Sequence, residues 1–323
     1  MKGALSLAQQ AVEEALRDAG FWDGQALQGI DPDRLGCTVS VSKPLFQDNV
    51  FNVFPPERVN ESIRLHFGMA GESRNVVAAC ATGAYAIALA GSWIKQGLCD
   101  AVVAGSVEPE PHPFIAAGFE RMGVLSADGV TRPFDRDRSG FGMGAGAGVV
   151  VLESAEHARQ RGQPVQACLS GWAMGADAHS AVAFNSNGQR IAQVITACLR
   201  KAQLQPEQLQ HVNAHGTATR LNDRIETRAI LKAFGRWADR LQISATKAGT
   251  GHLLGAAGSV EFAFTVLALR NQFVPPTATL EHPDPECPLN YTPRQGHAAR
   301  LEHAMSLSFG FGGPIGALAV SAS

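Results

Sequence analysis

The stretch VVAACATGAYA, residues 76–86, decides the fold of this chain. Val76 to Cys80 is a short apolar run that predicts a buried strand, and the Ala-rich, proline-free sequence after it predicts a helix to about Gly97. A cysteine at such a corner lies at the positive end of the helix dipole, which favours the nucleophilic thiolate. Thr82 and Gly83 keep the corner small, so that a substrate could approach closely. The stretch therefore predicts a reactive cysteine, with a buried structural cysteine as the alternative.

Composition excludes several classes of protein. The chain has 323 residues, of which 45% are hydrophobic and 17% charged, and its net charge of −2 comes without a basic run that would suit a nucleic-acid partner. Its six cysteines form no CxxC pair and no zinc-ligand spacing, which predicts a reduced, cytoplasmic protein without a metal site. The first twenty residues include Glu13, Glu14 and Asp18 and predict an amphipathic helix, not a signal peptide. Residues 76–94 are uncharged but too rich in small polar residues for a membrane span, so we expect a soluble protein without a membrane partner.

Helix and strand patterns alternate along the chain, which predicts an α/β fold in layers. We expect helices over residues 3–19, 57–66, 154–162, 188–203, 222–234 and 255–272. We expect strands over 36–40, 101–105, 149–152, 165–172, 211–213, 242–244, 305–308 and 315–320. Residues 109–138 are predicted to be rich in loops, with no regular structure over 109–113, and their prolines indicate a wall or lid beside a site. Two series of similar layout predict two related halves, 1–154 and 155–323.

Three later segments carry chemistry-bearing residues: NAHGTAT (213–219), SATKAGTGHLLGAAG (244–258) and SFGFGG (308–313). His215 and His252 each stand at or just past the end of a predicted strand, where open α/β sheets place their ligands. One such histidine alone is more often structural. Two in matching contexts, together with Cys80, predict an active site.

In order and spacing these segments resemble the β-ketoacyl-[acyl-carrier-protein] synthases of the thiolase-like superfamily, especially the elongating Cys-His-His enzymes. The resemblance runs from the ALRDAG helix (15–20) through the Cys80 corner and RPFDRDRSGFGMGAGAG (132–148) to SFGFGG, and so covers nearly the whole chain. It implies that Cys80 is the acyl-accepting nucleophile and that His215 and His252 serve malonyl decarboxylation and condensation. It further implies that Lys247 supports the site electrostatically.

The resemblance also assigns substrate contacts. Thr217 and Thr219 match the hydroxyls that hold the phosphopantetheine arm, which arrives on the acyl carrier protein, so no cofactor of the enzyme itself is expected. The backbone N–H groups of Cys80 and Phe311 match the oxyanion hole, and Phe309 with Phe311 matches the gating loop. The implied fold is thiolase-like: two halves with mixed five-stranded sheets, stacked in α-β-α-β-α layers around a buried helix pair.

The implied function is that of an acyltransferase, a 3-oxoacyl-[acyl-carrier-protein] synthase of fatty acid or polyketide-type biosynthesis. A cysteine is a soft nucleophile and a good leaving group for an acyl thioester, and two neutral imidazole N–H donors can stabilise the enolate left by malonyl decarboxylation. We expect a homodimer or a heterodimer with another ketosynthase-like subunit. Acyl chain length, pathway and dimer partner stay open.

Other functions fit these residues less well. A non-condensing partner subunit, like a chain-length factor, typically lacks the nucleophile that is present here as Cys80. A degradative thiolase has a second catalytic cysteine near the C-terminus, whereas no cysteine follows Cys287. The glycine run 142–146 leads into a strand, not a helix, and neither Tyr85 nor Tyr291 has a lysine four residues on, so a nucleotide site is not expected.

The sequence departs from the family pattern at Ser139, Ala145, Leu307 and Pro314-Ile315, and it lacks the family's opening strand. That strand pairs inside the first half's sheet, and an uncovered apolar edge is an aggregation site. We therefore expect either an incomplete gene product or a chain that needs a partner to cover the gap.

Overall fold

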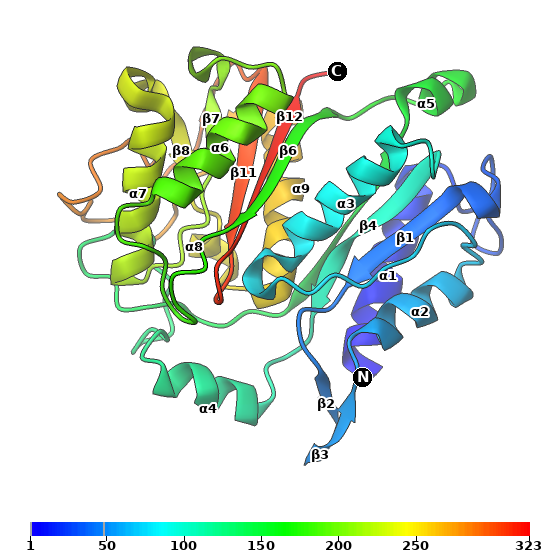
Figure 1. Cartoon of the computed structure of the whole chain (residues 1–323), viewed down its shortest axis with the longest axis horizontal. Coiled ribbons are helices and arrows are strands. Elements are labelled where there is room, and N and C mark those ends of the chain that lie inside the picture. Colours follow the sequence, from blue (N-terminus) through cyan, green and yellow to red (C-terminus); the bar gives the residue numbers. More distant parts are fainter. Residues whose placement is uncertain (1, 48) are drawn as a thin grey trace. The chain divides into compact units, whose positions relative to one another are not determined.

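Helices and strands alternate along the chain, as the sequence predicts (Figure 1). The computed structural model describes residues 2–47 and 49–323; the side chains of residues 2, 47 and 49–52 are not described. The helices are α1 (Lys2–Asp18), α2 (Glu57–His66), α3 (Thr82–Lys95), α4 (Pro113–Arg121), α5 (Ala155–Arg161), α6 (Gln189–Lys201), α7 (Arg220–Phe234), α8 (Lys247–Thr250) and α9 (Ala257–Asn271). The strands are β1 (Leu35–Ser40), β2 (Leu45–Gln47), β3 (Asn49–Phe54), β4 (Ala101–Glu108), β5 (Gly146–Glu153), β6 (Cys168–Ala176), β7 (His211–Asn213), β8 (Gln242–Ser244), β9 (Phe273–Val274), β10 (His297–Ala298), β11 (His303–Phe309) and β12 (Pro314–Ser321).

The chain divides into two units, each of which is described by itself. Unit 1 comprises Met1–His112, Ala145–Val165 and Leu254–Ala263, and unit 2 comprises Pro113–Gly144, Gln166–Leu253 and Phe264–Ser323. One boundary between them falls inside α9. The division at residue 154 that the sequence suggests stays a prediction.

A sheet in the order β1-β4-β5 forms the frame of unit 1. β1 runs parallel to β4, and β4 runs antiparallel to β5. Since successive residues of a strand point to opposite faces, alternate residues of β1 and β4 enter a core with α1 and α2. The other face of β4 carries Ser106, which lies against Gly83 at the start of α3. β4 is buried along its whole length because helices cover both faces.

A mixed five-stranded sheet in the order β6-β12-β11-β7-β8 forms the frame of unit 2. β12 is antiparallel to both of its neighbours, and β11, β7 and β8 run parallel to one another. Helix α6 packs on β6 and β12, and α7 packs on α6. The carboxyl ends of β7 and β8 therefore lie at one edge, and both predicted histidine segments follow them.

Most of the predicted elements are confirmed, but three expectations are wrong. Unit 1 has a three-stranded sheet within the described residues, where five strands were expected, because β2 and β3 pair with each other as a separate hairpin. Residues 76–78 are not a strand: the chain just before them bridges to β1 between Ser73 and Cys37, and the Val76 N–H then donates to the Ser40 side chain and not to the backbone of β1. The expectation that residues 109–113 lack regular structure fails at Pro113, which begins α4, because proline is tolerated in the first turn of a helix.

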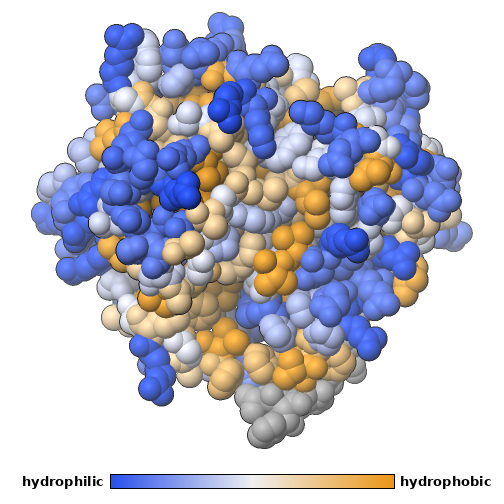
Figure 2. Space-filling view, viewed as in Figure 1, coloured by the Kyte–Doolittle hydropathy of each residue, from blue (hydrophilic) through white to orange (hydrophobic). Residues whose placement is uncertain are grey.

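The surface in the view of Figure 2 is mixed, with hydrophilic residues over much of it and apolar patches among them. Among the residues that the structure describes, no helix combines the length and the hydropathy needed to cross a membrane.

Candidate active site

Cys80 of unit 1 lies in a short 3-10 turn, Ala79–Ala81, that runs directly into α3. The Thr82 hydroxyl donates to the Ala79 carbonyl at 2.7 Å and accepts from the Ala78 N–H at 2.9 Å, which closes the turn. Ala79 has φ +47°, a value that non-glycine residues seldom adopt. The buried Cys80 therefore lies in a strained turn directly before α3, at the positive end of the helix dipole. The chain therefore does enter a helix directly after Cys80, as predicted, although a tight turn and not a strand precedes that helix.

His215 of unit 2 lies in the loop between β7 and α7, and its backbone is held by a buried carboxyl group. The Glu226 oxygens accept the His215 N–H at 2.7 Å and the Gly216 N–H at 2.8 Å. Burial of this carboxyl group, opposed by the two backbone donors, raises the pKa of Glu226 to about 8. Glu226 is therefore the anchor of the His215 loop, and no sequence argument had singled it out.

Lys247 begins α8 and is fully buried beside His215. Its Nζ lies 3.2 Å from His215 Nδ1 and also donates to the His215 carbonyl. Burial, followed by the charge of Lys247, holds the pKa of His215 well below its ordinary value, so the imidazole is neutral. A lysine ammonium is a donor only, so Nδ1 accepts from it and the ring proton sits on Nε2. His215 can then donate a hydrogen bond from Nε2.

His252 stands next to His215, with ring centroids 5.5 Å apart and planes at 83°. Its backbone pairs with the glycine run, because the His252 N–H donates to the Gly142 carbonyl at 2.8 Å and the Gly144 N–H donates to the His252 carbonyl at 3.0 Å. A Cβ at Gly142 would lie 2.2 Å from the Gly129 carbonyl oxygen, which explains why glycine is needed there. The glycine run therefore positions His252.

Aromatic rings surround the two imidazoles. Phe309, at the end of β11, lies 5.1 Å from His215 between ring centroids, and Phe141 meets His252 edge-on at 4.8 Å. Phe311 follows in the Gly310–Gly313 loop, and its ring lies 6.3 Å from that of Phe119 on α4. Phe119 also contacts Phe141 at 5.9 Å, so α4, which the sequence reading missed, belongs to this apolar wall.

Thr217 and Thr219 lie on the loop after His215, with their hydroxyl oxygens 3.0 Å apart. Thr219 is also the N-cap of α7, because its side chain accepts the Asn222 N–H. Their predicted role in holding the phosphopantetheine arm stays a prediction.

A buried cluster of one arginine and two carboxyl groups supports the end of the loop that carries Thr217 and Thr219. Arg138 is almost fully buried, and its guanidinium lies 3.5 Å from the Asp223 carboxylate and 2.6 Å from that of Asp284. It also donates to the carbonyls of Thr219 and Arg220 at the start of α7. Burial raises the pKa of Asp223 to about 6, although Arg138 opposes the shift. Arg138 thereby ties the RPFDRDR segment to the helix that carries Glu226.

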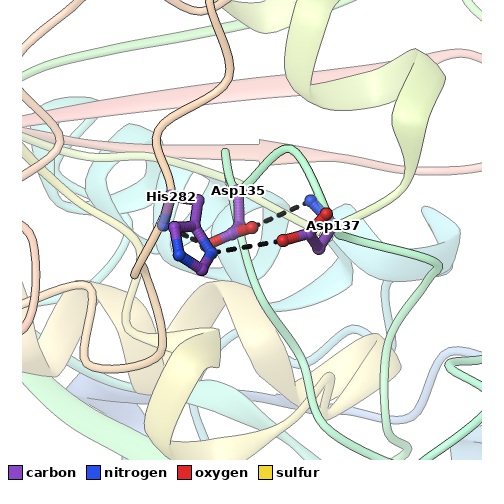
Figure 3. A group of neighbouring side chains, drawn as sticks. All are labelled: Asp135, Asp137 and His282. Carbon is purple, nitrogen blue, oxygen red and sulfur yellow. Dashed lines mark hydrogen bonds and ion pairs between the residues drawn. The ribbon is translucent and has the colours of Figure 1, made fainter.

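A second polar group, Asp135 with Asp137 and His282, has the spacing of metal ligands (Figure 3). The Asp135 oxygens, however, already accept three backbone N–H groups, those of Asp137, Glu281 and His282, at 2.7–2.8 Å. Asp137 and His282 are exposed and pair at 3.2 Å. The group braces two loops of unit 2 against each other.

The structure thus brings His215, Lys247, His252 and Phe309 together in unit 2, with Thr217, Thr219 and Phe311 on the adjoining loops. Cys80 belongs to unit 1. Of the departures from the family pattern, Leu307 is fully buried in the core of unit 2, and the Pro314 carbonyl accepts the Gly310 N–H at 2.9 Å to close the glycine loop.

Comparison with known proteins identifies the family. Residues 1–158 match the β-ketoacyl synthase N-terminal domain, and residues 166–281 match the β-ketoacyl synthase C-terminal domain. The chain belongs to the β-ketoacyl synthase family. The fold is accordingly thiolase-like.

Individual relatives agree with this assignment. The chain is 41% identical over 254 residues to 3-oxoacyl-[acyl-carrier-protein] synthase 2 of Synechocystis sp., an alignment that covers 77% of this chain and 61% of the relative. The chain thus spans about three fifths of the length of that curated relative. A type II polyketide ketosynthase, solved in complex with its acyl carrier protein and bound to the hexaketide, superposes with a TM-score of 0.92 and 30% identity, covering 99% of this chain and 85% of that one. The ishigamide ketosynthase/chain length factor superposes with a TM-score of 0.88 and 28% identity, covering 99% and 82%.

Proposed function

We propose that the chain is a condensing enzyme, a β-ketoacyl-[acyl-carrier-protein] synthase. The observation that carries the proposal is the pair of buried, perpendicular imidazoles with Lys247 beside one of them. A neutral imidazole that donates from Nε2 suits an oxygen on which negative charge develops. Membership of the family and the likeness to ketosynthases of fatty acid and polyketide biosynthesis support the same reaction.

In the proposed reaction, Cys80 Sγ attacks the acyl thioester carbonyl and the carrier thiol leaves, so the acyl group is transferred to the enzyme. Malonyl carrier protein then loses CO2, and the electron pair of the broken C–C bond forms an enolate whose oxygen accepts hydrogen bonds from His215 and His252. The enolate carbon attacks the acyl carbonyl, the backbone N–H groups of Cys80 and Phe311 stabilise the oxyanion, and the Cys80 thiolate leaves. Thr217 and Thr219 hold the phosphopantetheine arm, and Phe309 with Phe311 gates access.

The proposed partners follow from the similar structures. One of these contains an acyl carrier protein with its ketosynthase, and another a ketosynthase/chain length factor. We propose an acyl carrier protein as substrate carrier and a ketosynthase-like subunit, identical or different, as dimer partner. The reaction needs no cofactor besides the carrier's phosphopantetheine arm, and we expect it to take place in the cytoplasm.

The decisive experiment measures CO2 release from malonyl carrier protein. Replacement of either His215 or His252 by Ala should slow decarboxylation by about 10²–10³-fold, the usual cost of losing one oxyanion donor. His179→Ala, an exposed histidine of the same unit, is the matched control and should leave the rate unchanged. A wild-type chain that never decarboxylates malonyl carrier protein, alone or with an added active synthase, would refute a condensing role. A chain that does not decarboxylate malonyl carrier protein by itself, but changes the product length of an added synthase, would be a partner subunit.

Acylation is tested separately by intact mass after incubation with acyl carrier proteins of graded chain length. The wild type should gain the mass of one acyl group, whereas Cys80→Ala should gain none. Cys99→Ala serves as the control, since burial raises the pKa of that thiol and keeps it protonated. Acylation that persists in the Cys80 variant would overturn the assignment of the nucleophile.

A further inference from the structure

Two oppositely charged side chains are buried at the carboxyl ends of β1 and β4 in unit 1. Because these strands are parallel neighbours, their ends lie at the same edge of the sheet (Figure 1). Glu108 is the last residue of β4 and is 1% exposed. Lys43, which follows β1 by three residues, forms an ion pair with it, and the Lys43 side chain is 22% exposed. A buried ion pair adds little net stability, so stability alone does not account for this one.

The same edge of unit 1 carries the chain segment that leads to Cys80. The Val41 N–H donates to the Asn75 side chain at 2.9 Å. One residue further on, the Val76 N–H donates to the Ser40 hydroxyl at 2.9 Å. The segment that enters the Cys80 turn therefore starts beside the residues that lead from β1 to the ion pair.

One glycine connects the ion pair with the turn that contains Cys80. Gly255 lies in the 3-10 turn Leu254–Ala256, which packs against both β4 and the Cys80 turn. Its N–H donates to the Glu108 carboxylate at 3.3 Å. A Cβ at Gly255 would lie 2.5 Å from the Ser42 side chain and 3.4 Å from a Glu108 oxygen, so this glycine touches the charged group directly. The ion pair is thus linked to the Cys80 turn through a single 3-10 turn.

Lys43 has more hydrogen-bond donors than the described part of the chain accepts. An ammonium group has three N–H donors, and among the described residues Glu108 is its one partner. A partly exposed lysine of this kind suits an oxygen of a bound molecule. An alkyl chain would remove water from the charge without replacing its hydrogen bonds. An acyl group with a keto or hydroxyl oxygen is therefore favoured beside Lys43 over an alkyl group of the same length.

We propose that Lys43 donates a hydrogen bond to an oxygen of the acyl group that Cys80 carries, and thereby selects keto- or hydroxyl-bearing acyl groups over plain alkyl chains. The inference rests on the proposed function and adds the class of acyl group that the site takes. Lys43 is a specificity-determining residue and takes no part in bond making. Glu108 holds its ammonium group in place through the ion pair.

The test is a competition for Cys80 that is followed by intact mass. The chain is mixed with equal amounts of two acyl carrier proteins, one loaded with a hexanoyl group and the other with a hexanoyl group that has an oxo group at its third or, in a separate mixture, at its fifth carbon. In the wild type, at least one oxo isomer should acylate the chain about tenfold faster than hexanoyl, or more. Lys43→Met should bring this ratio to about one, because methionine fills a similar space without donors. Lys95→Met, at an exposed lysine of the same unit, is the matched control and should keep the wild-type ratio.

A second variant guards against loss of folding, since an unpaired buried carboxylate is destabilising. Lys43→Met/Glu108→Gln leaves no unpaired charge and should also give a ratio of about one. If the variants slow both acylations equally and keep the wild-type ratio, the ion pair is structural and the proposal is overturned. A wild type that is acylated efficiently but shows no preference for either oxo isomer would overturn the specificity alone. If none of the carrier proteins acylates the wild type, the proposed function fails together with this inference.

Discussion

At the scale of single residues, Gly216 decides the path of the loop that carries His215. It adopts φ +43°, and a Cβ there would lie 2.6 Å from the Ala245 Cβ. Gly216→Ala combines left-handed strain with a steric conflict in the core, so we expect the free energy of unfolding to fall by about 1–3 kcal/mol in urea denaturation.

The matched control for this prediction is Gly249→Ala. Gly249 lies in α8, does not have a positive φ, and has no atom within 4 Å of an added Cβ. Alanine is the better helix former, so this variant should be as stable as the wild type or slightly more stable. Equal losses in the two variants would show that the positive φ of Gly216 is not the reason for its effect.

At the scale of elements, the start of α7 depends on Thr219. Its hydroxyl accepts the Asn222 N–H, one of the donors that a helix leaves unpaired in its first turn. Thr219→Ala should lower the free energy of unfolding by about 1 kcal/mol, measured in urea, whereas Thr219→Ser should restore most of it. A serine variant as unstable as the alanine variant would mean that packing of the threonine methyl, and not the cap, is what matters.

Helix α7 also shows why a charged residue on a helix is ambiguous in sequence. Asp223 and Glu226 sit three residues apart, a spacing that places them on one face. From the sequence alone, two acidic residues on one face of a helix predict that this face is exposed to solvent. In the structure both carboxyl groups are fully buried and hold the backbone of Phe134, His215 and Gly216.

At the scale of the whole molecule, stability should depend on pH through a buried histidine to which the proposed reaction assigns no role. His211 begins β7, and burial lowers its pKa to about 4. In the unfolded chain His211 binds a proton with a pKa near 6.5, whereas in the folded chain it binds one only near pH 4. The stability associated with neutral His211 is therefore lost as the pH falls from about 6.5 to about 4. Over that range the loss approaches about 3 kcal/mol.

The measurement compares urea unfolding of the wild type and His211→Gln at pH 7 and at pH 4.5. The variant should lose distinctly less stability on acidification, because its side chain does not titrate. Buried Asp223 and Glu226, whose pKa values are raised, act in the opposite direction, but they are present in both proteins and cancel in the comparison. His179→Gln, at an exposed position, should follow the wild type. Parallel pH curves for all three proteins would contradict the prediction.

Local patterns in the sequence determined most of the elements. Helix α2 has the bounds that its apolar spacing predicts, 57–66, and β7 and β8 are the predicted strands 211–213 and 242–244. The order of the motifs also led to the correct family, because short glycine-rich segments around Cys80, His215 and His252 form a highly specific set. The bounds of these elements and the family motifs both depend on residues that are close together in the chain, and the sequence shows such residues directly.

Only the tertiary structure decided the rest. Residues 76–78 have the composition of a strand, but a strand exists only if a partner offers its backbone, and here the Val76 N–H meets the Ser40 side chain of β1 in place of its backbone. Glu226 and Arg138 look like surface charges until the fold removes them from water and pairs them with backbone groups and carboxylates. The contact between Lys247 and His215 joins residues that are 32 positions apart. Burial and long-range pairing arise when distant segments pack, so local periodicity cannot reveal them.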